Sequence, residues 1–278
     1  MSKKSILKDS LFFISLLVLF SIVFYFLVPQ SNAQLTKNDF LENETAQLHY
    51  VALGDSLTQG TGDTTNQGGF VSLLSDHLES DNKYQVTSSN FGVAGNTSQQ
   101  ILKRMTKDET ILPTIKEADF MTLTVGGNDV MAVIKKNLSQ LEISSFDQPQ
   151  KDYQKRLRQI IDLARKENDD LPIYILGIYN PFYLNFPEIV EMQEIIDKWN
   201  EATATVASEY ENIYFVPIND QLYKGYNGKE GIVETNDSST SVINNALFEE
   251  DHFHPNNIGY QIIANAMMEK INETRDKW

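Results

Sequence analysis

Short apolar runs alternate with amphipathic stretches over most of the chain. The apolar runs are rich in β-branched and aromatic residues and end at Gly, Pro, Asn or Asp, which is typical of strands. They lie at Tyr50–Leu53, Val86–Phe91, Phe120–Val125, Ile173–Ile178 and Ile213–Ile218. Because these runs are almost continuously apolar, we expect parallel strands that are covered on both faces.

Helical periodicity fills the intervals between these runs. It is clear in Tyr153–Lys166, where apolar residues recur at helical spacing and Lys155, Arg156 and Arg158 fall on the opposite face. The other predicted helices are Phe70–Leu78, Thr97–Met105, Pro187–Tyr210 and Ile258–Ile271. The repeated strand–helix–strand order implies right-handed crossovers and predicts a three-layer α/β/α sandwich.

Two segments interrupt this alternation. Residues 135–150 and 219–247 are polar and have no clear periodicity. They are therefore expected to form long excursions near the ends of the strands.

The N-terminus has a different pattern. A basic tail, residues 1–10, precedes residues 11–28, which carry no charge, and small residues near Ala33 suit a signal peptidase. A cleaved signal peptide and a retained transmembrane anchor both remain open, and the length and aromatic content of the stretch favour the anchor. Lysines before it and acidic residues after it predict that the rest of the chain lies outside the cytoplasm.

A polar linker is expected between this segment and the working domain. Residues 29–46 have little periodicity and many polar side chains. The domain is therefore expected to occupy residues 47–278, a length that can bury a sizeable core.

The composition disfavours several classes of function. The chain has 278 residues, with 23 Lys and Arg against 38 Asp and Glu, so its net charge of −15 makes nucleic acid an unexpected partner. It has no cysteine, which excludes disulfides, thiol catalysis and zinc–cysteine sites. Its stability must therefore come from packing.

A serine follows the first predicted strand. The apolar run breaks at Gly54, so Ser56 is expected on a tight turn at the C-terminal edge of the sheet, where open parallel sheets place their chemistry. A serine hydroxyl becomes an effective nucleophile when a base removes its proton, and its reaction needs donors for an oxyanion. Gly-Asp-Ser is also typical of ordinary turns, so the tripeptide alone decides little.

A candidate base and a candidate acid lie near the C-terminus. Asp251 precedes His254 by three residues, so its carboxylate can reach Nδ1 and leave Nε2 to accept a hydroxyl proton. A metal site is the competing interpretation, because Asp251, His252 and His254 are all candidate ligands. We disfavour it, since no cysteine and no further histidine lie nearby, and we expect His252 to be a solvated neighbour.

The turn after the second predicted strand offers one candidate oxyanion donor. A glycine at position 95 lets a backbone N–H approach a ligand closely, and the start of a helix adds partial positive charge. The alternative is a plain strand-to-helix turn that is capped by Thr97.

The turn after the third predicted strand offers another donor. Gly126 and Gly127 free the backbone, and the carboxamide of Asn128 can donate to a developing oxyanion. The alternative is that Asn128 or Asp129 caps a helix that begins near residue 130.

Taken in order, these motifs resemble a known family. The segments Gly54-Asp55-Ser56-Leu57, Gly95, Gly126-Gly127-Asn128-Asp129 and Asp251-Phe253-His254-Pro255 are similar to the four blocks of the SGNH (GDSL-type) hydrolases. The resemblance covers residues 47–278. It implies a flavodoxin-like α/β/α fold with a five-stranded parallel sheet, an ester-cleaving site at the C-terminal edge of that sheet, and neither a cofactor nor a metal.

The resemblance also assigns roles. Ser56 would be the nucleophile, His254 the base and then the acid, and Asp251 the residue that orients the histidine. The Ser56 N–H, the Gly95 N–H and the Asn128 side chain would form the oxyanion hole. Members of the family include lysophospholipases, short-chain esterases, arylesterases and carbohydrate O-acetylesterases.

We therefore expect an extracytoplasmic serine ester hydrolase that cleaves lysophospholipids or short-chain esters through an acyl-enzyme on Ser56. The apolar segment Tyr179–Phe186 favours acyl substrates because it could line an acyl groove, although its aromatics could equally pack between helix and sheet. The alternative is an O-acetylesterase that acts on a cell-envelope polysaccharide. A non-catalytic surface-binding domain is less favoured.

Overall fold

The computed structural model describes residues 3–27, 45–80, 83–137, 142–184, 190–223, 233–236, 239–242 and 244–277. The chain divides into two units, Met1–Glu44 and Thr45–Trp278. The domain expected over residues 47–278 lies within the second unit.

The first unit contains the expected N-terminal helix. Helix α1 (Lys3–Leu27) includes residues 11–27 of the uncharged stretch, and the side chains of residues 11–25 are exposed. Among the residues that the structure describes, no helix has the length and apolar content needed to cross a bilayer. The transmembrane anchor expected at residues 11–28 is therefore not supported, and the expected cleavage site near Ala33 lies outside the described residues.

The second unit is built on a five-stranded parallel sheet with the order β2-β1-β3-β4-β5. The strands are β1 (Ala46–Gly54), β2 (Tyr84–Gly92), β3 (Phe120–Thr124), β4 (Ile173–Leu176) and β5 (Ile213–Val216). The predicted strands and the predicted flavodoxin-like sheet are confirmed. Because the strand order reverses at β1, the carboxyl end of this strand lies at the switch point where parallel sheets form their crevice.

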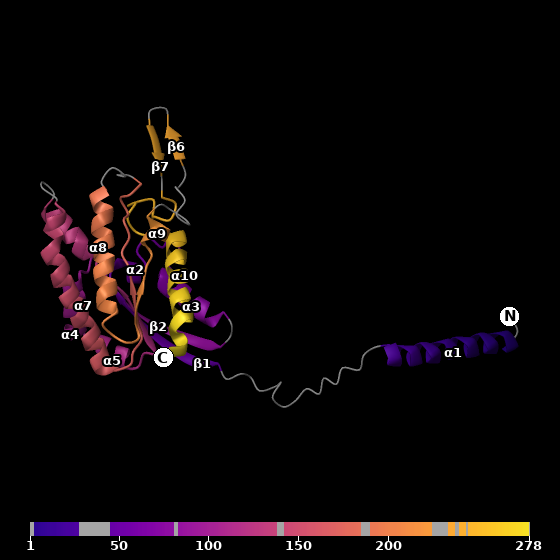
Figure 1. Ribbon diagram of the computed structural model, residues 1–278. Helices are drawn as coiled ribbons and strands as arrows, with labels where there is room; N and C mark the ends of the chain where they lie inside the picture. Colours follow the sequence, from indigo (N-terminus) through magenta and orange to yellow (C-terminus); the bar gives the residue numbers. More distant parts are fainter. Residues whose placement is uncertain are drawn as a thin grey trace. The chain divides into compact units, whose positions relative to one another are not determined.

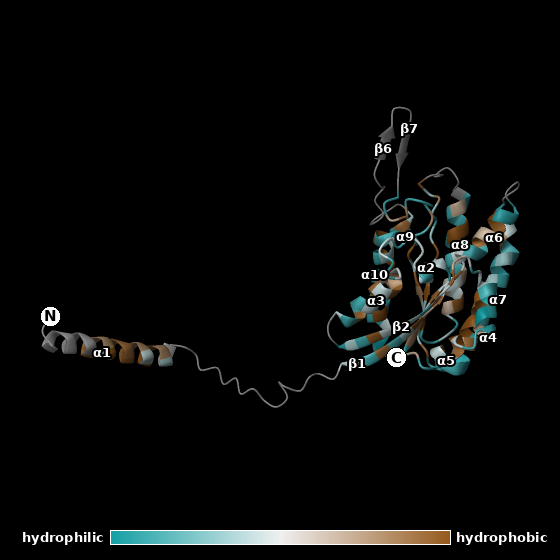
Figure 2. Cartoon of the chain, turned by 180° about the vertical axis from the view of Figure 1, so that it is seen from behind, coloured by the Kyte–Doolittle hydropathy of each residue, from teal (hydrophilic) through white to brown (hydrophobic). Residues whose placement is uncertain are grey.

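Helices cover both faces of the sheet (Figure 1). One face carries α3 (Phe70–Glu79) and α10 (Asn257–Thr274), and the other carries α4 (Ser98–Lys107), α5 (Ile111–Lys116), α7 (Asp147–Glu167) and α8 (Val190–Ala207). Side chains of β1 alternate between two cores, with Tyr50 and Ala52 in the first and Val51 and Leu53 in the second. The three-layer α/β/α sandwich is confirmed, and Figure 2 shows hydrophobic residues gathered on the strands and on helix faces turned toward them.

Strand β2 differs from the expectation that every strand is covered on both faces. All residues of β3 and β4 are buried, whereas no residue of β2 is buried. The reason is topological, because β2 lies at the edge of the sheet and pairs with β1 alone. The residues of this strand fit that place, because Thr87, Ser88, Ser89 and Asn90 are polar.

The two segments expected to be long excursions contain regular structure. In residues 135–150, a 3₁₀ turn (Ile143–Phe146) leads directly into α7, which begins at Asp147, so this expectation is wrong for the described part of the segment. Residues 219–247 contain the short helix α9 (Asn219–Leu222) and an antiparallel pair, β6 (Val233–Asn236) with β7 (Ser239–Val242). Elements this short bury too few side chains to show a hydrophobic periodicity in the sequence.

Candidate active site

Ser56 stands on a tight turn at the carboxyl end of the central strand. It opens the short helix α2 (Ser56–Gln59) directly after β1, and its exposed fraction is 6%. Asp55 caps this helix, because its carboxylate accepts a hydrogen bond of 3.1 Å from the Leu57 N–H. The cap fixes the direction in which the chain leaves the strand and therefore the direction of the serine side chain.

A histidine and an aspartate complete a hydrogen-bonded row with this serine. Ser56 Oγ lies 3.0 Å from His254 Nε2, and His254 Nδ1 lies 2.6 Å from Asp251 Oδ2. Because an ionised carboxylate can only accept hydrogen bonds, Nδ1 is the donor to Asp251. In the neutral ring Nε2 is then unprotonated and faces the serine hydroxyl, which is the arrangement that general-base activation requires.

The Asp251 carboxylate is held in its ionised form. Its Oδ1 accepts hydrogen bonds from the backbone N–H groups of Phe253 and His254, at 2.9 and 3.0 Å. Burial opposes ionisation, but the hydrogen bonds from the His254 side chain and from these backbone groups outweigh it and hold the pKa of Asp251 below its usual value. His252 is exposed and has a positive φ of 51°, which turns the loop between the two functional side chains.

The segment that carries His254 is fixed from two sides. The Tyr179 hydroxyl donates to the Phe253 carbonyl at 2.6 Å. Asn256 caps α10 by accepting from the Ile258 N–H at 2.9 Å, and its side-chain amide donates to the Leu247 carbonyl at 2.9 Å. The imidazole is thus positioned by groups outside the row as well as by Asp251.

The sequence assigns two backbone N–H groups, those of Ser56 and Gly95, to the oxyanion hole. Among the described residues, neither the Ser56 N–H nor the Gly95 N–H donates a hydrogen bond to a protein atom. Gly95 has a φ of +78°, and an added Cβ there would meet no atom within 4 Å, so the space beside it is open. The turn also leads into a capped helix, since the Thr97 N–H donates to the Gln100 side chain at 2.9 Å. The two sequence interpretations of this turn are therefore compatible.

Asn128 lies in the first turn of α6 (Gly127–Lys136) and does not cap it. The helix is preceded by Gly126, which has a φ of +114° and makes no side-chain cap, so the alternative that Asn128 or Asp129 caps this helix is wrong. The Asn128 side-chain amide donates to the Asn96 carbonyl at 3.1 Å. Because a carboxamide nitrogen carries two hydrogens, one N–H remains for a further acceptor.

A buried network connects the segments that carry Gly95 and Asn128. The Asp129 carboxylate accepts from the Ser98 N–H at 2.8 Å and from its hydroxyl at 2.5 Å. Arg156 of α7 donates to Ser98 Oγ at 2.7 Å and pairs with Asp129 at 3.2 Å. Since Ser98 opens α4 and Asp129 follows Asn128, this network fixes the distance between the two candidate donor segments.

The sequence pattern predicts the wrong environment for the Arg156 side chain. Its position opposite the apolar stripe of α7 predicts a solvated side chain, but that side chain is only 24% exposed and contacts Asp129, whose side chain is 6% exposed. The partner lies 27 positions earlier in the chain, so no periodicity within α7 could indicate it.

Thr124 is a second residue that the sequence pattern does not single out. Its hydroxyl donates to Asp55 Oδ1 at 2.8 Å and accepts from the Asp55 N–H at 3.1 Å, which ties β3 to the turn that carries Ser56. Burial raises the pKa of the Asp55 carboxyl, and the hydrogen bonds from Thr124 and from the Leu57 N–H oppose that rise. A β-branched residue at the end of an apolar strand looks like ordinary core, so its polar role is not readable from the sequence.

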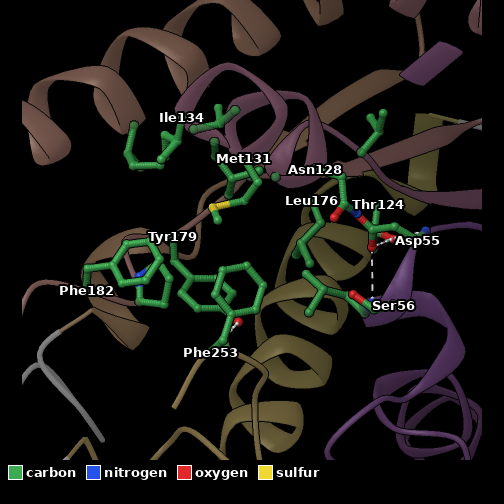
Figure 3. Close-up of a pocket in the computed structure, with 18 of the residues that line it drawn as sticks. Asp55, Ser56, Thr124, Asn128, Met131, Ile134, Leu176, Tyr179, Phe182 and Phe253 are labelled. Atoms are coloured by element: carbon green, nitrogen blue, oxygen red, sulfur yellow. Dashed lines mark hydrogen bonds between the residues drawn. The ribbon is translucent and has the colours of Figure 1, made fainter. Parts of the chain in front are cut away.

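An apolar cavity lies beside Ser56 (Figure 3). Its volume is about 640 Å³, including space that is open to solvent. Its walls include Met131, Ile134, Leu176, Tyr179, Phe182 and Phe253. In the segment expected to line an acyl groove, Tyr179, Pro181 and Phe182 line this cavity, whereas Tyr183 packs against Tyr223 with ring centroids 4.6 Å apart. Residues 185 and 186 of that segment lie outside the described residues.

A parallel α/β/α sandwich whose sheet edge holds serine, histidine and aspartate in one hydrogen-bonded row has the architecture of a serine hydrolase. The family model described as "GDSL-like Lipase/Acylhydrolase family" matches residues 52–262. The chain belongs to this family and is an ester hydrolase of the GDSL type, as the four sequence blocks predict.

Known proteins resemble this chain over most of its length. It is 33% identical over 222 residues to the uncharacterized protein YpmR of Bacillus subtilis, with 80% of each chain covered. It is 27% identical over 228 residues to the spore germination lipase LipC of Bacillus licheniformis, with 81% of this chain and 94% of that protein covered. The solved structure of the lipase Lip_vut3 from a goat rumen metagenome has the same fold, with a TM-score of 0.64 and 23% identity over 80% of this chain and 96% of that chain.

Proposed function

We propose that this protein hydrolyses acyl esters outside the cytoplasm, with lysophospholipids and short-chain esters as its substrate class, through an acyl-enzyme on Ser56. The observation that carries the proposal is the row from Ser56 Oγ through His254 to Asp251, at 3.0 and 2.6 Å, beside an apolar cavity. The location rests on the charges that flank residues 11–28, and cell fractionation tests it.

In the first half of the reaction, Ser56 Oγ attacks the ester carbonyl while His254 Nε2 takes its proton. The carbonyl oxygen becomes an oxyanion, which accepts hydrogen bonds from the Ser56 N–H, the Gly95 N–H and the second N–H of the Asn128 carboxamide. The bond to the leaving alcohol then breaks, and His254 gives its proton to the alcohol oxygen. The acyl group remains bound to Ser56 as an ester.

In the second half, water takes the place of the alcohol. His254 removes a proton from the water as its oxygen attacks the acyl carbon, and a second oxyanion forms at the same donors. Collapse of this intermediate releases the carboxylic acid and returns the proton to Ser56. Asp251 stays ionised throughout, because it accepts from Nδ1 and stabilises the imidazolium that forms twice in each cycle.

The lining of the cavity favours acyl chains over acetyl groups on a polysaccharide. The side chains farther from Ser56 are apolar or aromatic, and the Tyr179 hydroxyl already donates to the Phe253 carbonyl. Sugar recognition depends on polar groups that hydrogen-bond hydroxyls, whereas a hydrocarbon chain needs apolar surface. An O-acetylesterase is therefore the less favoured function, and a panel of esters distinguishes the two.

A panel of p-nitrophenyl esters from acetate to palmitate, beside an acetylated glycan, tests the proposal on the full chain. We expect kcat/KM to be higher for acyl groups longer than acetate, because their methylenes leave water. Activity on acetate and on the glycan that vanishes for longer chains would favour the O-acetylesterase. A folded protein that neither turns over any ester nor reacts with a fluorophosphonate would favour a binding domain.

Replacing Asn128 by alanine is expected to lower kcat by about 100- to 1,000-fold, because one oxyanion donor is lost. The matched control is Asn137→Ala at the other end of α6, where the side-chain amide donates to the Val133 carbonyl at 2.9 Å. Steady-state kinetics on several esters measures both variants. Equal rates for Asn128→Ala and the wild type would remove Asn128 from the proposed oxyanion hole.

A further inference from the structure

Helix α6 carries one row of side chains along the cavity. Asn128, Met131 and Ile134 all line it, and successive members of the row are three residues apart, so each lies beside the next on the helix surface. Figure 3 shows this row leading away from Ser56, with Asn128 on the side of the serine and Ile134 at the opposite side of the cavity. A rise of 1.5 Å per residue separates Asn128 from Ile134 by about 9 Å along the helix axis.

The wall contributed by α8 is apolar as well. Met192 and Ile196 lie one helical turn apart, and their exposed fractions are only 9% and 4%. Methionine side chains are unbranched and flexible, so Met131 and Met192 can adjust to a chain that lies between the two helices. The space between α6 and α8 is therefore lined by side chains that can adapt to an unbranched hydrocarbon chain.

The polar side chains of the lining are gathered near Ser56 or are already paired. Asp55 accepts from Thr124 at 2.8 Å and from the Leu57 N–H at 3.1 Å, and the Tyr179 hydroxyl donates to a backbone carbonyl. Among the lining residues that the structure describes, none offers a charged group beside Met131 or Ile134. A charged or hydroxylated group at the far end of a substrate would lose its hydration there without a new partner.

The surroundings of α6 change directly after Ile134. This side chain is partly buried, whereas Lys135 and Lys136, which end the helix, are exposed. Neither lysine lines the cavity, so a chain that extends beyond Ile134 meets no further apolar side chain of α6. Methylenes beyond that point bury little further surface and add little affinity.

We propose that α6 measures the acyl chain, because it binds the chain as far as Ile134, so that activity gains from added methylenes up to medium-chain fatty acyl groups and not beyond them. The inference rests on the ester hydrolysis proposed above. With the ester carbonyl between Ser56 and Asn128, an extended chain running past Met131 to Ile134 covers about 9 Å, which corresponds to about seven carbon–carbon steps. Activity then rises to acyl groups of about eight carbons and levels off beyond them.

Three substitutions on α6 test the inference with p-nitrophenyl esters, whose leaving group is constant. Ile134→Trp fills the far end of the cavity, and we expect the ratio of kcat/KM for octanoate to that for acetate to fall at least about tenfold. Ile134→Ala removes the last apolar contact on α6, and we expect the ratio of kcat/KM for octanoate to that for hexanoate to fall by about threefold. Ala132→Leu is the matched control, because Ala132 is exposed on the same helix and does not line the cavity. It should keep the wild-type profile of chain lengths.

The outcomes separate this inference from the function on which it rests. If the Ile134 variants hydrolyse esters with the wild-type profile, α6 does not measure the chain, while ester hydrolysis itself still stands. If the wild type hydrolyses no ester and does not react with a fluorophosphonate, the proposed function fails. If Ile134→Trp is inactive on every ester because it does not fold, Ile134→Ala decides, and an unchanged profile in that variant overturns the inference.

Discussion

Replacing Ser56 by alanine is expected to reduce kcat by about a million-fold, because the proposed acyl-enzyme cannot form without the hydroxyl. The change removes one oxygen whose hydrogen-bond partner among the described residues is His254, so the fold should persist. Release of p-nitrophenol measures turnover, and a mass increase after fluorophosphonate treatment measures labelling.

The control for this variant is Ser80→Ala, which removes a hydroxyl at the end of α3 that donates to the His77 carbonyl at 2.7 Å. That protein should keep both turnover and labelling. If Ser56→Ala retained turnover within tenfold of the control, the nucleophile would have to be another residue. Circular dichroism of both variants shows whether a loss of activity comes from the site or from unfolding.

Replacing Asp251 by asparagine is expected to lower kcat by about 10,000-fold while the fold is kept. An asparagine can donate its amide N–H to Nδ1 of His254, and this stabilises the ring tautomer that carries its proton on Nε2. That nitrogen then cannot accept the Ser56 proton, although the distance between the two atoms is unchanged. Pre-steady-state kinetics should show that formation of the acyl-enzyme is slowed.

The matched control is Glu250→Gln, which removes the same charge from an exposed position next to Asp251. Because it leaves the tautomer of His254 alone, its kcat should stay close to that of the wild type. Equal activities of Asp251→Asn and Glu250→Gln would show that Asp251 does not orient the histidine.

The fold was largely predictable because its central elements are regular. Strands β3 and β4 are buried on both faces, so the sequence there is apolar throughout, and α7 is long enough to show an apolar stripe. The exposure of β2 could have been expected from its polar residues 87–90, but its place at the edge follows from the order of the strands. Helix α5 has only six residues and contains Pro113, so it leaves no helical signature.

Some contacts of the candidate site were likewise predictable from the sequence, and others were not. Asp251 and His254 are three positions apart, so their contact could be expected from local spacing, and the glycines around Ser56 indicated a turn. The contacts of Thr124 and Arg156 join segments that are distant in the chain, and neither residue type is unusual for its strand or helix. Candidate catalytic residues can therefore be identified from motifs, whereas the residues that hold them in place are identified only from the tertiary structure.

The contact between Arg156 and the Asp129 carboxylate gives helix α7 an indirect influence on the rate of the proposed ester hydrolysis. Arg156 is the α7 residue of that network and lies away from the cavity beside Ser56, yet its guanidinium helps to set the spacing of the segments that carry Gly95 and Asn128. If the packing of α7 loosened, both segments would shift together, and the developing negative charge would lose two of its proposed hydrogen-bond donors at once. The speed of the reaction would then report on the integrity of a remote scaffold element before the protein as a whole unfolds.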